Sequence, residues 1–200
     1  MARLSLNKAS LHKESAKLKR YRQYLPSLDL KRRQLMAERA KGLAQLKTTE
    51  LQIEQCRQKV SETLPMVSYR DINLNDLVKV SAVVIGEENI VGITVPILRK
   101  VGLVTMTYSP YLKPHWVDAL VVQLKLMLEL KLRQQVDRRR LTILEAAVKK
   151  VTQKVNLFDK VLIPKTERNI RKIRIYLSDA ERADVVRAKM TKQLRIKQGV

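Results

Sequence analysis

The second half of the chain carries an apolar stripe at the spacing that two paired helices require. The stripe alternates intervals of three and four residues at Leu141, Leu144, Val148, Val151, Val155, Phe158 and Leu162. This alternation keeps the apolar side chains on one side of a helix, where a second helix can cover them. Further apolar residues begin the stripe near Val117 and continue it to Leu177. The pattern predicts one long helix across residues 115–200.

The first 65 residues repeat apolar side chains at intervals of seven, which is the heptad pattern of a coiled coil. One heptad position holds Leu4, Leu11, Leu18, Leu25, Leu46, Ile53 and Val60. Arg32 and Arg39 interrupt this position, and an apolar stripe displaced around the helix covers the interval. Pro26 lacks a backbone N–H, so we expect it to bend or interrupt the helix, and Pro164 to bend the second one. A second long helix is therefore predicted across residues 1–65.

The stretch between these helices, residues 66–114, has the composition of strands and turns. Residues 78–85 are rich in β-branched side chains, residues 86–89 (Gly-Glu-Glu-Asn) suit a turn, and residues 90–97 return as a second β-branched run. We therefore expect a β-hairpin with its turn at residues 86–89. The predicted fold class is mainly α: a long antiparallel two-helix coiled coil with a small β-hairpin region in the middle of the chain. The two helices are expected to pair as one domain.

The charge of the chain lies on its two helical segments. The sequence holds 41 lysines and arginines against 19 aspartates and glutamates, a formal net charge of +22. Residues 66–114 contribute only +1 of this excess. So large a basic excess favours an acidic partner, whether nucleic acid, an anionic membrane surface or an acidic protein. A nucleic-acid-binding coiled coil and a structural tether are therefore alternatives to any more specific role.

Residues that carry out catalysis or bind cofactors are sparse in this sequence. One cysteine, Cys56, and two distant histidines, His12 and His115, supply neither a disulfide framework nor a zinc site. The sequence contains no glycine-rich phosphate loop and no nucleophile elbow. Cys56 falls on the apolar side of its helix, where a packing thiol is expected. The sequence predicts neither a stand-alone enzyme nor a bound cofactor, and the lack of a long apolar run predicts a soluble cytoplasmic chain.

Three strings in the predicted helices are similar to those of a known family. They are Leu-Asp-Leu-Lys-Arg-Arg-Gln-Leu at residues 28–35, Lys-Val-Asn-Leu-Phe-Asp-Lys-Val-Leu-Ile-Pro at 154–164 and Asn-Ile-Arg-Lys-Ile at 169–173. With the hairpin between two long helices, they resemble the D subunit of the V-type (archaeal and vacuolar-type) ATPases and ATP synthases over nearly the whole chain. The family often has a Gly-His pair just before the first string, where this chain has Tyr-Leu-Pro at residues 24–26.

The resemblance implies a central rotor shaft (central stalk) that transmits torque between a catalytic ring and a membrane rotor that moves protons or sodium ions. The implied partners are the catalytic and non-catalytic ring subunits (A and B), the F subunit of the stalk and a membrane-side adaptor of the C or d type, with one copy of the chain per complex. ATP chemistry would belong to the partner subunits, with no cofactor on this chain and no nucleic acid. The chain would be cytoplasmic and peripheral to the membrane, without insertion into it.

The resemblance also implies roles for particular residues. The seam that makes the two helices turn as one rod would comprise Leu11, Leu18, Leu46, Ile53, Leu141, Leu144, Val148, Val151, Val155, Phe158 and Leu162. Arg171, Arg174 and Arg187 are expected to contact acidic residues of the ring. The hairpin residues Val83, Ile85 and Ile93 are expected to lie near the F subunit. The chain ends, near residues 4–11 and 185–196, are expected to occupy the upper bearing of the ring.

Overall fold

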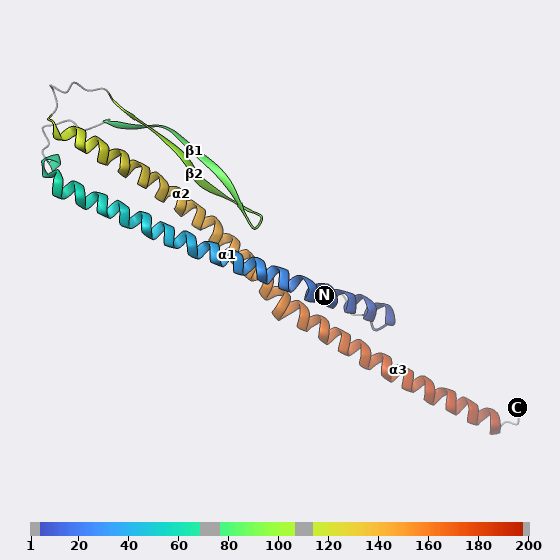
Figure 1. Ribbon diagram of the computed structural model, residues 1–200. Coiled ribbons are helices and arrows are strands. Elements are labelled where there is room, and N and C mark those ends of the chain that lie inside the picture. The colour runs from blue at the N-terminus through green and yellow to red at the C-terminus, as the bar shows by residue number, and fades with distance from the viewer. Residues whose placement is uncertain (1–4, 69–76, 107–113, 198–200) are drawn as a thin grey trace. The chain divides into compact units, whose positions relative to one another are not determined.

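The protein is mainly helical, with a two-stranded antiparallel hairpin between two long helical segments that pack together, as the sequence predicts (Figure 1). A computed structural model describes residues 5–68, 77–106 and 114–197, so Leu4, the first member of the predicted heptad position, lies outside the described residues. Helix α1 spans Lys8–Thr63 and is followed by the short 3-10 helix η1, Pro65–Ser68. Strands β1 and β2 span Val78–Ile90 and Ile93–Thr105. Helix α2 (Trp116–Asn156), the π-helical segment η2 (Leu157–Leu162) and helix α3 (Ile163–Lys197) follow one another without a break.

The chain divides into two compact units, and each unit contains part of both long helical segments. The end unit comprises the chain up to Lys31 together with the chain from Val151 onward. The hairpin unit comprises Arg32–Lys150 and therefore holds most of α1 and α2 and the whole hairpin. Each unit has its own pair of helices, because α1 contributes to one and then the other along its length.

The core of the hairpin unit lies between α1 and α2. Its fully buried side chains include Leu35 on α1 and Leu144 on α2. Where α1 ends and α2 begins, a separate apolar cluster closes the unit, formed by Leu64, Leu77, Trp116, Val117, Leu120 and Val121. Burial of each such side chain contributes about 1.5–3 kcal/mol relative to exposure. Aliphatic packing therefore holds these two helices together.

The two helices of the hairpin unit approach closely at Gly42. This glycine is buried, and a Cβ added there would lie 3.0 Å from Cδ2 of Leu141. Glycine within a helix costs about 1 kcal/mol relative to alanine. The close contact with Leu141 explains why α1 has a residue without a side chain at this point.

The hairpin turn does not lie where the sequence analysis expects it. The prediction of a turn at residues 86–89 is wrong, because both strands continue through this region and Gly86 pairs with Ile97. The turn is at Val91 and Gly92, whose φ angles of 54° and 78° suit a tight two-residue connection. The side-chain Oδ1 of Asn89 accepts a hydrogen bond of 2.8 Å from the backbone N–H of Gly92. Gly86 lies against the exposed side chain of Arg99 on β2, which would have to shift if residue 86 carried a Cβ.

The two helical prolines have different surroundings. Helix α1 continues through Pro26, so the interruption considered for this position does not occur. Pro164 is the second residue after the π-helical segment η2. The N–H of Ile163, which caps that segment, donates to the carbonyl of Phe158, five residues earlier. In an α-helix the ring of Pro164 would press on the carbonyl of Lys160. The wider π turn accommodates the proline without ending the helix.

Candidate functional site

The predicted seam residues of the hairpin unit lie mostly in its interior. Ile53 on α1 is buried, as are Leu141, Leu144 and Val148 on α2. Leu46 is half-buried. The predicted heptad position is interrupted at Arg39, and near this interruption α1 buries a different set of positions. These are Leu35, Gly42 and Thr49. These three residues follow one another at intervals of seven, so a heptad displaced from the predicted one carries the packing here.

The predicted seam residues of the end unit are less uniformly enclosed. Val151 and Val155 are buried. The remaining members are half-buried: Leu11, Leu18, Phe158 and Leu162. The ring of Phe158 packs edge-on against Tyr21 of α1, with the ring centroids 5.4 Å apart. Edge-to-face geometry of this kind adds about 0.5–1.5 kcal/mol beyond the area that it buries. Farther along α3, Ile170 and Ile173 are buried and extend the apolar contact.

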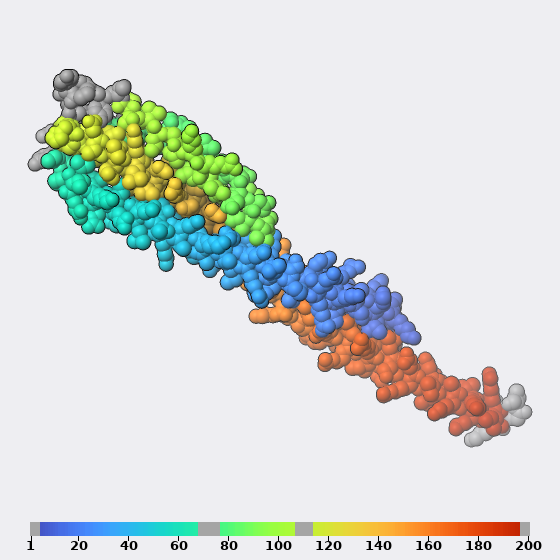
Figure 2. Space-filling model, viewed as in Figure 1, coloured from blue at the N-terminus to red at the C-terminus, as the bar shows by residue number. Residues whose placement is uncertain are grey.

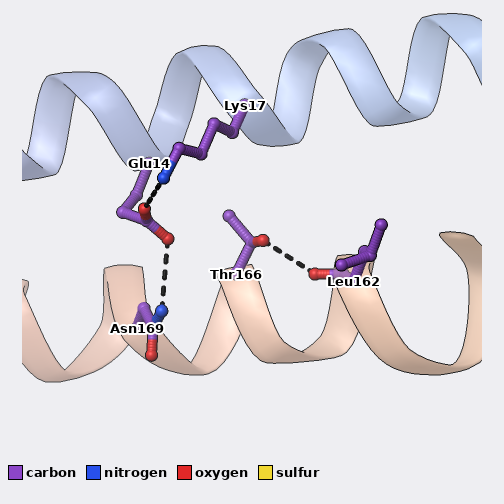
Figure 3. Close-up of polar contacts among 5 residues, drawn as sticks. All are labelled: Glu14, Lys17, Leu162, Thr166 and Asn169. Carbon is purple, nitrogen blue, oxygen red and sulfur yellow. Dashed lines mark hydrogen bonds and ion pairs between the residues drawn. The ribbon is translucent and has the colours of Figure 1, made fainter. Parts of the chain in front are cut away.

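A polar contact crosses the end unit between α1 and α3. Figure 3 shows Glu14 directed toward Asn169, whose Nδ2 donates a hydrogen bond of 3.2 Å to Oε2 of Glu14. Lys17 donates to the other carboxylate oxygen of Glu14 at 2.7 Å. The side chain of Glu14 is only 12% exposed. A polar pair in a seam favours one register of the two helices, because any other alignment would lose the hydrogen bond between Glu14 and Asn169.

The surroundings of Glu14 lower its pKa. Burial alone would raise the pKa of this carboxyl group, but the hydrogen bonds from Lys17 and Asn169 and the positive charges of Lys17 and Lys165 outweigh burial and hold it below the ordinary value. Glu14 therefore stays ionised at neutral pH. Sequence reasoning missed this contact, although Asn169 follows Leu162 at the seven-residue spacing of the seam, which was a usable signal.

Ion pairs join the two helices at the margins of the seam in each unit. In the end unit, Arg22 lies 2.6 Å from the carboxylate of Glu167. In the hairpin unit, Glu50 accepts hydrogen bonds of 3.0 Å from both Arg138 and Gln134. The bond from Arg138, followed by that from Gln134, lowers the pKa of Glu50. Exposed pairs of this kind contribute little to stability individually, about 0.2–1 kcal/mol, but they help to align the helices.

An ion pair joins the hairpin to α2, and two apolar side chains near the hairpin turn are buried. Nη2 of Arg140 lies 3.0 Å from Oε2 of Glu88, and the Arg140 side chain is only 17% exposed. Ile90 and Val95, near the hairpin turn, are buried. Figure 2 shows the hairpin surface lying along the surface of α2. Arg138 and Arg140 both form ion pairs within the chain, with Glu50 and Glu88.

The residues predicted to contact partners are accessible to different degrees. Val83 and Ile85 are exposed on β1, and Ile93 on β2 is half-buried. Arg171, Arg174 and Arg187 are exposed on α3. Arg187 forms an exposed ion pair of 3.2 Å with Asp184, one turn before it. The structure therefore brings Arg171 and Arg174 to one part of α3 but gives Arg187 a partner of its own.

The last turns of α3 carry apolar side chains in contact with solvent. All residues from 181 to 196 are exposed. Large apolar side chains among them are Val185, Val186, Met190, Leu194 and Ile196. Within the end unit, α3 continues beyond the first turn of α1 (Figure 1), so this part of α3 has no helix beside it among the described residues.

The described residues also bear on metal binding, thiol chemistry and membrane crossing. Across residues 5–68, 77–106 and 114–197, no group of three or more histidine, cysteine or acidic side chains is placed to hold a metal ion. Cys56 is buried, and its Sγ lies 3.6 Å from Oε1 of Gln123. Within the same part of the chain, no helix combines the length and apolar content needed to cross a bilayer.

Comparison with known proteins gives matches that span the chain. Residues 10–193 match the family model that describes the D subunit of ATP synthase. The D subunit of the V-type ATP synthase of Chlamydia felis is 35% identical over 195 residues, which cover 96% of this chain and 93% of that protein. The D subunit of the V-type ATP synthase of Borreliella burgdorferi is 31% identical over 197 residues, covering 98% of this chain and 97% of its own length. The similarity therefore includes both helical segments and the hairpin.

Proposed function

Because the chain belongs to the D-subunit family of the V-type ATP synthases, we propose that it is the central rotor shaft of a V/A-type rotary ATPase. In this role it transmits torque between the catalytic ring and the membrane rotor that moves ions. The chain itself is non-catalytic, and the ring subunits carry out ATP hydrolysis or synthesis.

The observation that supports this proposal most directly is the aliphatic contact between the helices within each unit. A shaft has to resist twisting, and two helices with interlocked side chains resist it, since relative rotation would expose what they bury. Leu35, Leu144 and Ile173 are completely buried in these contacts. Exposure of one such side chain costs about 1.5–3 kcal/mol, so several together oppose separation strongly. The polar contact between Glu14 and Asn169 adds resistance to sliding in the end unit.

The surfaces left accessible suggest how the shaft meets its partners. The exposed apolar turns of α3, residues 185–196, suit the upper bearing of a ring made by the A and B subunits. Arg171, Arg174 and Arg187 are accessible for contacts with acidic ring residues. The exposed hairpin residues Val83 and Ile85 are available to the F subunit. A membrane-side adaptor of the C or d type would complete the connection to the rotor, and the assembly would be cytoplasmic and peripheral to the membrane.

Observation of rotation tests this function directly. Cysteine replaces Glu87, an exposed hairpin residue, in a Cys56→Ala background, and the new thiol carries a bead while the ring is fixed to glass. We expect the bead to turn in one direction when ATP is added, and to stop with a non-hydrolysable ATP analogue. A complex that hydrolyses ATP while the bead stays still would refute the proposal and would favour a structural tether.

A seam variant tests whether the paired helices carry the torque. Leu144→Asp places a charge at a completely buried position of α2, whereas Glu145→Gln changes its exposed neighbour. In assembled membranes, we expect Leu144→Asp to reduce ATP-driven ion transport more than ATP hydrolysis, because a loosened shaft uncouples the two. Glu145→Gln should leave the ratio of transport to hydrolysis unchanged.

A further inference from the structure

The end unit contains an open groove between α1 and α3 that neither helix fills. Its volume is about 600 Å³, which lies in the range of about 300–1,000 Å³ typical of ligand-binding sites. Leu18 of α1 and Ile170 of α3 line it with apolar surface. Ile175 also lines it and is 56% exposed, so apolar surface of the groove remains in contact with solvent.

The same groove is strongly basic. Lys19 and Arg22 contribute from α1, and Arg171 and Arg174 from α3. Arg22 is paired with Glu167, the acidic residue of the groove, at 2.6 Å. Lys19, Arg171 and Arg174 have no ion pair among the described residues. These three like charges around one groove repel one another, because a Debye length of about 8 Å at physiological ionic strength screens neighbouring charges only in part.

The Arg22–Glu167 pair indicates which chemistry the groove accepts. In this pair the carboxylate of Glu167 is bound by Arg22 at the wall of the groove, and apolar side chains lie beside it. A second source of carboxylates would satisfy the three remaining cations in the same way. A small free anion would gain only screened attraction here and would leave Ile175 exposed, whereas a peptide segment can cover the apolar surface at the same time.

We propose that this groove binds an acidic peptide segment of another subunit, with two or more carboxylates and a large apolar side chain on one face. The identity of that subunit as part of the ATPase complex rests on the function proposed above. The carboxylates pair with Lys19, Arg171 and Arg174, and the apolar side chain covers Ile175 and enters beside Ile170. The groove thus acts as a docking surface for an acidic partner, and not only as a set of separate surface charges.

Neutralising the groove should have opposite effects on the free chain and on the complex. The variant Lys19→Gln/Arg171→Gln/Arg174→Gln removes the mutual repulsion, so the melting temperature of the isolated chain should stay constant or rise. It also removes the charges that the acidic segment binds, so its dissociation constant for the chain-depleted complex should rise about tenfold or more. A merely structural role for these cations would instead lower the melting temperature.

A matched control variant distinguishes binding in the groove from a general effect of the net charge of the chain. Lys13→Gln/Arg20→Gln/Arg182→Gln removes the same charge from exposed positions of the end unit that do not line the groove. We expect this control to bind within about twofold of the wild type, since isolated exposed charges contribute little. Equal weakening by both triple variants would overturn the groove as the docking surface. Failure of the wild-type chain to bind the depleted complex would overturn the proposed function as well.

Photo-cross-linking identifies the occupant. A benzophenone amino acid at position 175 faces the groove, and the same group at Tyr176, which is 50% exposed but does not line the groove, is the control. In the assembled complex, position 175 should cross-link to a segment rich in aspartate or glutamate, and position 176 should not cross-link to that segment. Attachment to nucleic acid, or to a segment without acidic residues, would overturn the proposal.

Discussion

The close approach of the helices at Gly42 allows a quantitative test of the packing in the hairpin unit. Replacing Gly42 with leucine adds a side chain where a Cβ alone would lie 3.0 Å from Cδ2 and 3.6 Å from Cγ of Leu141. Leu141 is itself buried, so it has no open space into which it can move. The new side chain must therefore push α1 and α2 apart or force Leu141 into a strained rotamer.

The expected magnitudes follow from the two opposing effects of the change. Overpacking a close contact costs about 1–3 kcal/mol. Replacement of glycine by leucine in a helix returns about 0.8 kcal/mol of helix propensity. Gly42→Leu should therefore lower the free energy of unfolding by up to about 2 kcal/mol. Leu141→Ala alone should lower it by about 2–5 kcal/mol, because it leaves a cavity in the seam.

The double variant tests whether direct packing of these two side chains produces both effects. In Gly42→Leu/Leu141→Ala, the leucine on α1 fills the space that the leucine on α2 vacates, so the two effects should not add. We expect a coupling free energy of about 1–3 kcal/mol in favour of the double variant, measured by urea unfolding followed by circular dichroism. Additive effects within about 0.5 kcal/mol would show that these side chains do not contact each other, and would refute a packing role for the glycine.

Three further predictions concern charges and the seam. The lowered pKa of Glu14 contributes stability that is present above the ordinary value of 4.5 and is lost as pH falls through the lowered value. Thermal melts between pH 6 and 3 should show this loss, and Glu14→Gln should remove that part of the pH dependence. Arg140→Gln should weaken hairpin docking by about 1 kcal/mol and speed amide exchange near the hairpin turn, whereas Arg139→Gln should not. Val151→Asp/Phe158→Asp should destabilise the end unit by several kcal/mol, and unchanged circular dichroism melts would contradict the seam assignment.

The sequence predicts the helices well because their packing repeats along the chain. Alternating intervals of three and four residues place Leu141, Leu144 and Val148 on one helical face, whatever the partner is. The contact between Glu14 and Asn169 is different, since 155 residues separate its members. A pattern within one helix does not encode its register against another, so this contact follows only once both helices are placed.

The position of the hairpin turn shows why local composition misleads in the centre of the chain. Residues 86–89 have the composition of a turn, whereas Val91 is a β-branched residue that seldom adopts positive φ. The connection forms nonetheless because Gly92 follows and Asn89 accepts its N–H. Gly86 lies against the side chain of Arg99 on the other strand, and a contact of this kind is invisible in the sequence alone.

The π-helical segment before Pro164 determines which way the side chains of α3 face around the helix axis. A π turn accommodates about one residue more than an α turn, and each residue of an α-helix corresponds to about 100° of rotation. Conversion of residues 157–162 to α geometry would therefore swing Ile170 and Ile173 about a quarter of a revolution away from α1. Pro164 disfavours that conversion, because in an α-helix its ring would press on the carbonyl of Lys160. The burial of Ile170 and Ile173 opposes it as well, so the π turn keeps the apolar face of α3 directed toward α1.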